Sequence, residues 1–168
     1  MVVYAICPSE KYGFLTTGVL ADTRSFISDL REGALGRRAY SLKKSEESLG
    51  NVCPIEISCL TVAIDAKAKS SVNIKNKCIS LTGVNGYELV IPELIDALDT
   101  EKSEIDFFSE TKQIKRIKKY CFATNRLRNI DLFFIPNCLT PVMCTDRFYD
   151  CCKQNKLTGV SFKMIFRE

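Results

Sequence analysis

The stretch PVMCTDRFYDCCKQNKLTGVSFKMIF, residues 141–166, decides the predicted fold because it holds a strand, a helix and a second strand in succession. Residues 141–144 are apolar enough for a short strand. Thr145 then suits the N-cap of a helix, and Asp146 adds a favourable negative charge to the first helical turn. An apolar stripe follows at helical spacing, made of Phe148, Cys151 and Cys152. The sequence therefore predicts a helix that starts at Thr145.

The end of the same stretch predicts a tight turn into a final strand. Asn155 suits the left-handed conformation at a helix C-terminus, and Leu157-Thr158-Gly159 forms the turn. We expect a positive φ at Gly159, because glycine adopts that conformation at little cost. Beyond it, apolar residues alternate with other residues, which is typical of a half-buried strand. A strand is therefore expected over 159–166.

A second unit of similar shape is predicted upstream. Residues 87–91 favour a strand, and Pro92 suits the first position of a helix. Apolar residues then recur at helical spacing: Leu94, Ile95 and Leu98. This spacing predicts a helix from Pro92 to about Asp99. Since residues 94–98 can be aligned with 148–152, we interpret the two units as a repeat.

The rest of the chain adds short apolar runs separated by polar segments. Further strands are predicted at 2–7, 55–64, 105–108, 120–125 and 131–135, a short helix at 25–30, and a polar exposed connection at 67–77. Such a mixture predicts an α+β fold, a mainly antiparallel sheet with two or three short helices packed on it. At 168 residues the chain is expected to be a single domain over 1–168.

The chain contains no histidine, which restricts the chemistry it could perform. Histidine is the commonest general acid or base near neutral pH, so triads and Cys–His pairs are excluded. The glycines do not form a phosphate loop, since Gly83-Val84-Asn85-Gly86 precedes a strand rather than opening a helix. No motif pairs two carboxylates, and no catalytic residue is expected.

Nine cysteines are scattered along the chain, an odd number without any Cys-x-x-Cys spacing. Adjacent Cys151 and Cys152 would point about 100° apart on a helix and cannot chelate one ion well. We expect the thiols to be reduced and mostly buried, with no bound metal and no cofactor. No signal peptide or membrane span is readable, so the reducing cytoplasm is the expected compartment and no membrane partner is expected.

The densest charge feature is the basic run Lys112 to Tyr120, in a chain whose net charge is only +4. It could contact phosphate or an acidic protein surface. Acidic residues precede it closely and can neutralise it in space: Glu101, Glu104, Asp106 and Glu110. Nucleic acid is therefore the disfavoured partner, and a protein is favoured. Arginine is enriched at interfaces, so the candidate contact residues are Lys115, Arg116, Arg126 and Arg128.

The C-terminal half resembles a family of bacterial immunity proteins of polymorphic-toxin and type VI secretion systems. The likeness runs from Thr145-Asp146-Arg147-Phe148 to Leu157-Thr158-Gly159-Val160-Ser161-Phe162. Leu89 to Leu94 is similar to the family's earlier unit, with Pro92 where serine is common. Tyr120 to Asn125 is similar to its next strand, and Asp131 stands where an acidic residue follows. Together these pieces span residues 85–168, with Thr145, Leu157, Thr158, Gly159 and Phe162 as the structural motif.

The resemblance implies a binding protein without enzyme activity, whose partner is a cognate toxin or effector domain. The net charge of +4 disfavours mimicry of nucleic acid, although the acidic segment 101–110 keeps it open. Two other functions stay open: a small enzyme that uses a cysteine or a carboxylate, and a nucleic-acid-binding regulator that uses residues 112–119.

Overall fold

The structure is a computed structural model that describes residues 1–12, 14–16, 28, 41–43, 49–55, 61–81, 84–110 and 114–168. In chain order its elements are β1 (Val2–Pro8), β2 (Phe14–Thr16), β3 (Ser41–Lys43), β4 (Val52–Ile55), β5 (Thr61–Asp65), α2 (Ala66–Val72), β6 (Cys78–Ser80), β7 (Tyr87–Val90), β8 (Glu93–Leu94), β9 (Glu104–Phe107), β10 (Ile114–Lys119), η2 (Thr124–Leu127), β11 (Leu132–Ile135), β12 (Cys138–Thr145), α3 (Asp146–Gln154) and β13 (Val160–Arg167). The predicted helix at 25–30 and the strand residues 56–60 lie outside these ranges, apart from Ser28.

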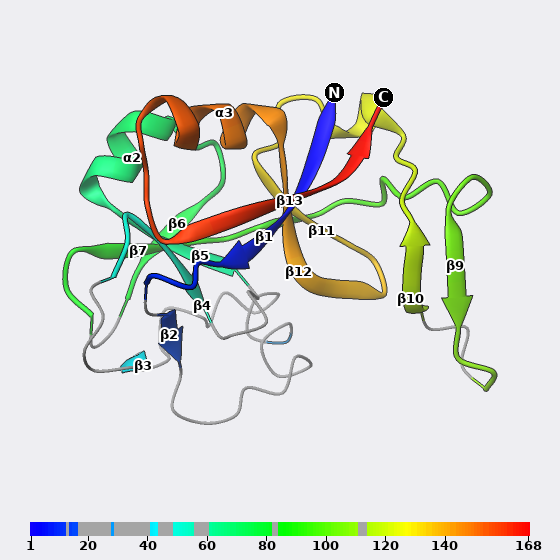
Figure 1. Cartoon of the computed structure of the whole chain (residues 1–168), viewed down its shortest axis with the longest axis horizontal. Coiled ribbons are helices and arrows are strands. Elements are labelled where there is room, and N and C mark those ends of the chain that lie inside the picture. Colours follow the sequence, from blue (N-terminus) through cyan, green and yellow to red (C-terminus); the bar gives the residue numbers. More distant parts are fainter. Residues whose placement is uncertain are drawn as a thin grey trace.

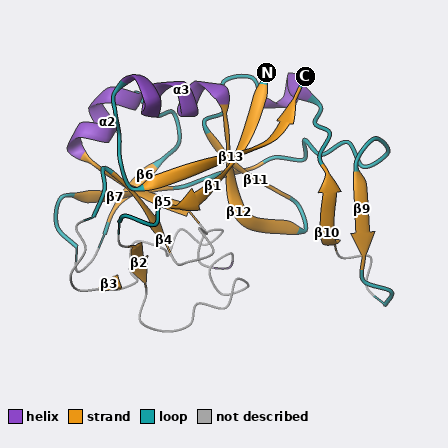
Figure 2. Ribbon diagram, viewed as in Figure 1, coloured by secondary structure: helices purple, strands orange, loops and turns teal. Residues whose placement is uncertain are grey.

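The described strands form three sheets rather than the one that was predicted (Figures 1 and 2). Five strands lie in the order β13-β1-β12-β11-β8, six lie in the order β3-β2-β4-β5-β7-β6, and β9 pairs with β10 alone. Most neighbours are antiparallel, and the parallel pairs are β8 with β11 and β2 with β4. The α+β expectation is confirmed, and so is the expected predominance of antiparallel pairing.

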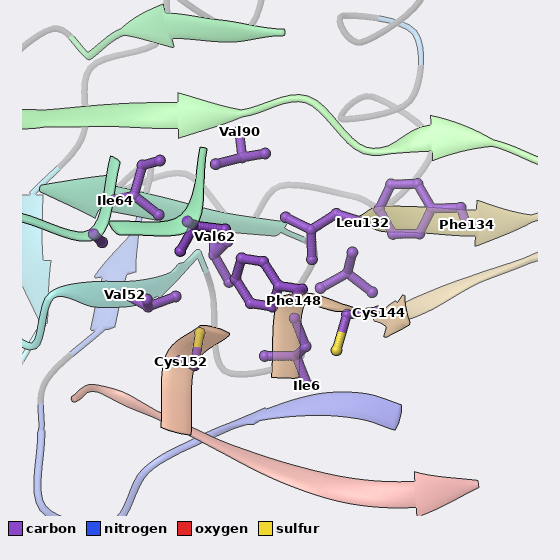
Figure 3. Packing of buried hydrophobic residues seen from close by; sticks show 13 residues of the cluster. Ile6, Val52, Val62, Ile64, Val90, Leu132, Phe134, Cys144, Phe148 and Cys152 are labelled. Carbon is purple, nitrogen blue, oxygen red and sulfur yellow. The ribbon is translucent and has the colours of Figure 1, made fainter. Parts of the chain in front are cut away.

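One hydrophobic core is shared by the five-stranded and six-stranded sheets. Side chains from both sheets and from both helices meet in it: Ile6, Val52, Val62, Ile64, Ala68, Val72, Val90, Leu132, Phe134, Val142, Cys144, Phe148 and Cys152. Figure 3 shows the ring of Phe148 among several of these side chains. The expected strand–helix–strand unit at the C-terminus is confirmed, since β12, α3 and β13 follow one another.

β11, an inner strand of the five-stranded sheet, is buried on both faces, which explains its unbroken apolar run. Leu132 and Phe134 point into the shared core, whereas Phe133 and Ile135 pack on the opposite face. That second face is covered by Ile95, Leu98, Tyr120, Phe122 and Leu127. A strand buried on both faces needs apolar residues at every position, as β11 has.

The predicted helix over 92–99 is wrong. Residues 93–94 form β8 and pair in parallel with β11, and the Ile95 amide donates to the Phe134 carbonyl at 2.8 Å. Leu98 then makes an isolated bridge with Phe122. The strand predicted over 120–125 is therefore wrong as well, because Phe122 pairs only at this bridge and residues 124–127 form η2. The three apolar residues that suggested a helix instead line an extended segment across the edge of the sheet.

A helix does form in the predicted polar connection at 67–77. Asp65 caps α2, because its carboxylate accepts a hydrogen bond from the Ala68 amide at 2.8 Å. Ala68 and Val72 are the residues that α2 buries in the shared core. The proposed repeat of residues 94–98 and 148–152 is wrong, since residues 94–98 form no helix; the helix that packs beside α3 is α2 (Figure 1).

The ends of α3 also differ from expectation in detail. Thr145 occupies the N-cap position, but its hydroxyl donates to the Ile130 carbonyl at 2.7 Å and does not cap the helix. Asp146 accepts a hydrogen bond from the Val2 amide at 2.9 Å. At the other end Lys156, with a φ of 51°, takes the left-handed position that was predicted for Asn155.

The turn before β13 joins the two large sheets through backbone contact. Gly159 has a φ of +106°, as expected, and a Cβ there would overlap the Val52 carbonyl oxygen. The Val52 amide donates to the Thr158 carbonyl at 2.9 Å. Asn51 bonds Thr158 on one side and donates from its side chain to Asp65 at 2.7 Å on the other. The turn is thereby linked to the residue that caps α2.

A second polar joint closes the opposite end of the shared core. Asn76 donates from its side chain to the Ile91 and Leu132 carbonyls and accepts a hydrogen bond from the Leu132 amide. Asp131, which is fully buried, accepts a hydrogen bond from the Lys75 amide at 2.8 Å. Arg147 forms an ion pair with Asp131, with Nε 2.7 Å from Oδ1. These residues link the end of α2, the start of β11 and the start of α3.

We predict that Gly159→Ala destabilises the protein more than Gly86→Ala. Both glycines have a positive φ, so each variant should lose about 1–3 kcal/mol of unfolding free energy. A Cβ at Gly86 meets open space, whereas one at Gly159 must displace backbone. Urea unfolding measures the difference, and equal losses would show that the close approach at Gly159 is not needed for stability.

We also predict that Arg147→Met costs about 3–5 kcal/mol, because it leaves the buried Asp131 carboxylate without its cation. The double variant with Asp131→Asn should recover part of this loss. Lys118→Met, which breaks an exposed ion pair with Asp106, should cost less than about 1 kcal/mol. The same small loss in Arg147→Met, measured by urea unfolding, would contradict the role given to the buried pair.

Candidate functional site

A two-stranded hairpin stands away from the two large sheets at one end of the molecule (Figure 1). It consists of β9 and β10, which pair antiparallel with each other and with no further described strand. We call this hairpin, over residues 104–110 and 114–119, the arm. The basic run that was interpreted as a turn and strand entry therefore forms most of a strand, from Ile114 to Lys119.

The root of the arm is fixed to the body by buried contacts. Ile117 and Tyr120 pack against the cluster on the second face of the five-stranded sheet. The Cys121 amide donates to the Ser103 hydroxyl at 2.9 Å, and the Asp99 amide donates to the Cys121 carbonyl at the same distance. The arm is therefore attached in a defined direction although its far part is exposed.

Two phenylalanines at the end of β9 are exposed on the arm. Phe107 is 51% exposed and Phe108 is 50% exposed, which places them among the most exposed large apolar residues described. The ammonium group of Lys115 lies 6.0 Å from the centre of the Phe108 ring, within range of a cation–π contact. Aromatic side chains are enriched at protein interfaces relative to the rest of the surface.

Charge on the arm is divided between its strands. β10 carries Lys115, Arg116, Lys118 and Lys119, whereas β9 carries Glu104 and Asp106. Lys118 lies 2.8 Å from Asp106, and its hydrogen bond is the main reason why the pKa of Asp106 lies below its usual value. The expected neutralisation of the basic run by acidic neighbours therefore occurs at this pair.

The four candidate contact residues do not form one patch. Lys115 and Arg116 are exposed on β10, while Arg126 lies on η2 and Arg128 directly follows it. Figure 1 shows η2 beside the C-terminus, above the end of β10 that is attached to the body. Arg126 is also engaged by the carbonyl and carboxylate oxygens of Asp96. Phe107 at the end of β9 and Phe108 directly after it, which the sequence had suggested only as strand residues, lie on the same arm as Lys115 and Arg116.

The residues of the C-terminal motif lie in the framework. Leu157 and Phe162 pack against the shared core, and Thr158 and Gly159 make the contacts with Asn51 and Val52 described above. Thr145 is almost fully buried and is held to Ile130. We therefore assign this motif a stabilising role.

A shallow cavity of about 370 Å³ lies between the start of α2, β5 and β7. Three charged residues line it: Asp65, Lys69 and Glu88. Asp65 caps α2, and Lys69 lies 2.7 Å from Glu88, with a pKa raised mainly by that hydrogen bond. Each charged group of the lining thus already has a partner within the protein.

Neither a metal centre nor a membrane span is found in the part of the chain that the structure describes. No group of three or more cysteine, aspartate or glutamate side chains there could hold a metal ion. No helix among these residues is long and apolar enough to cross a membrane.

Eight of the nine cysteines lie in the described part of the chain. Cys53, Cys144 and Cys152 are buried, while the other five are half-buried, so the expectation that most are buried was too strong. Burial raises the pKa of the Cys152 thiol to about 12. Cys59 lies outside the described residues.

The family comparison agrees with a role in protein binding. Residues 62–166 match the model of an immunity protein family, a segment that runs from β5 to β13 and includes the arm. Because this segment exceeds half of the 168 residues, the chain belongs to the Imm11 family of immunity proteins. No curated protein matches the chain. The expected resemblance to immunity proteins is thus confirmed.

We predict that the three buried thiols resist modification in the folded protein. A thiolate is the reactive form, and burial holds the Cys152 thiol protonated up to a pKa of about 12. With a thiol reagent at pH 8, Cys53, Cys144 and Cys152 should remain unlabelled until denaturant is added, as read by peptide mass mapping. Labelling of Cys152 in the folded protein as fast as that of Cys7 would contradict this assignment.

Proposed function

We propose that the protein neutralises a cognate toxin domain by tight one-to-one binding, as a single domain acting in the cell that makes the toxin. Membership of the Imm11 family supports this function. The resemblance of residues 85–168 favours a toxin of the polymorphic or type VI secretion class. Free thiols are found at Cys7, Cys78, Cys121, Cys151 and Cys152, which is consistent with a reducing compartment.

The arm is the part of the described surface that we propose for toxin contact. The observation that carries this proposal is the exposure of Phe107 and Phe108, with Lys115 over the Phe108 ring, on a hairpin that stands away from the body. Exposed aromatic side chains with neighbouring cations supply the buried anchors that dominate binding energy at interfaces. Fixing the root of the arm reduces the entropy that must be lost when it binds.

The alternatives draw less support from the described residues. A nucleic-acid-binding arm would expose an uninterrupted basic surface, whereas Asp106 forms an ion pair with Lys118 within the basic run. An enzyme would need a free acid, base or nucleophile in a cavity, and the charged groups of the cavity near α2 already have partners.

Co-expression with the toxin domain encoded by the adjacent reading frame tests the function. A protein that must leave almost no free toxin needs a dissociation constant near nanomolar, or about −12 kcal/mol. Growth should be protected when the two proteins are present in equal amounts, and a one-to-one complex should elute on size exclusion. Failure to protect, or protection at far less than one equivalent, would overturn stoichiometric neutralisation.

We predict that Phe107→Ala combined with Phe108→Ala weakens toxin binding about thirtyfold or more, equivalent to at least about 2 kcal/mol. Both rings are half exposed, so folding stability should hardly change. Leu94→Ala is the matched control, because Leu94 is 48% exposed and lies on β8 rather than the arm. Equal affinities of the double variant and the control, by calorimetry, would remove the arm from the interface.

A further inference from the structure

β10 is the inner strand of the arm, between β9 and the body (Figure 1), and its edge away from β9 is unpaired in the part of the chain that the structure describes. Its other edge pairs with β9, and no further described strand lies beside it. An unpaired edge presents backbone N–H and C=O groups that can take up an additional strand. With residues Ile114–Lys119, β10 is long enough for several main-chain hydrogen bonds to an added segment.

The side chains along β10 indicate the composition of a strand that would pair with this edge. Lys115, Arg116 and Lys119 are exposed and take part in no ion pair among the described residues, since Lys118 alone pairs with Asp106. The half-buried residues of the strand are Ile114 and Ile117. An incoming strand would thus meet three available cations and two isoleucines.

The strand that β10 already accepts has the complementary composition. In β9 acidic and apolar residues alternate as Glu104, Ile105, Asp106 and Phe107. Asp106 lies opposite Arg116, and Ile105 lies opposite Ile117. Opposite charges and apolar pairs across neighbouring strands are favourable, whereas like charges are unfavourable. A second copy of β10 would bring like charges together, so this edge disfavours pairing with itself.

We propose that the toxin contributes an extended segment of alternating acidic and apolar residues, which adds to the open edge of β10 as a third strand of the arm. This inference rests on the proposed function, because it names the chemistry of the partner at the same site. Main-chain pairing would supply affinity, and the three cations would select an acidic strand. Phe107 and Phe108 would lie at the end of the enlarged sheet.

The probe is a capped peptide of sequence Asp-Val-Glu-Ile-Asp-Val, added to isotopically labelled full-length protein. We expect amide shifts at 114–119 and binding that weakens as salt is added. A capped Lys-Val-Lys-Ile-Lys-Val peptide should not bind, and a proline at the centre of the acidic peptide should abolish binding, because proline donates no hydrogen bond.

Neutral substitutions on β10 test whether its cations attract the acidic peptide, without adding negative charge to the arm. Lys115→Gln with Arg116→Gln should weaken the acidic peptide about tenfold. Lys67→Gln with Lys163→Gln is the matched control, since both lysines are exposed on other elements, α2 and β13. Equal weakening by both pairs would reduce the effect to net charge and overturn the proposal.

The outcome can be separated from that of the proposed function by two further results. If wild-type protein protects cells from the toxin but neither binds the peptide nor loses toxin affinity in Lys115→Gln with Arg116→Gln, the added strand is refuted while neutralisation stands. If wild-type protein fails to protect, neutralisation itself is refuted, whatever the peptide does.

Discussion

A fully buried carboxylate must be paired and hydrogen-bonded, and Asp131 meets this requirement only where three elements converge. It binds the Lys75 amide after α2 and the Arg147 guanidinium at the start of α3, while it leads into β11. Beside it, Asn76 joins the end of β7 to β11. These groups hold α2, α3 and β11 together at one end of the shared core. At the other end Asn51 and the Gly159 turn perform the corresponding task.

A body closed in this way can serve as a fixed support for an exposed binding element. The arm leaves the body at Ser103 and returns at Cys121, where the two residues are hydrogen-bonded. Among the side chains of the arm, the half-buried Ile117 belongs to a hydrophobic cluster, whereas the aromatic and basic side chains do not. In an Imm11 immunity protein this arrangement separates stability, which depends on the body, from partner choice, which we assign to the arm.

Sequence alone predicted the elements whose apolar pattern, caps and turn residues lie within the element itself and match the residues that the fold buries. The strand, helix and strand over 141–166 are of this kind, as is the positive φ of Gly159. The helix predicted at 92–99 failed because its apolar residues pack on the edge of a distant strand, β11, which sequence spacing cannot reveal. In α2 only two residues are buried, so its polar composition hid it, although Asp65 was a readable cap.

The candidate site was predictable only in part for a similar reason. Lys115 and Arg116 stood out by charge, yet whether a phenylalanine such as Phe107 is buried depends on the long-range packing of its strand.

Hydrogen exchange of the protein with and without its toxin domain tests the central claim most directly. The account predicts that new protection in the one-to-one complex falls mainly on residues 104–110 and 114–119. Protection confined to the body, with the arm exchanging as in the free protein, would contradict it.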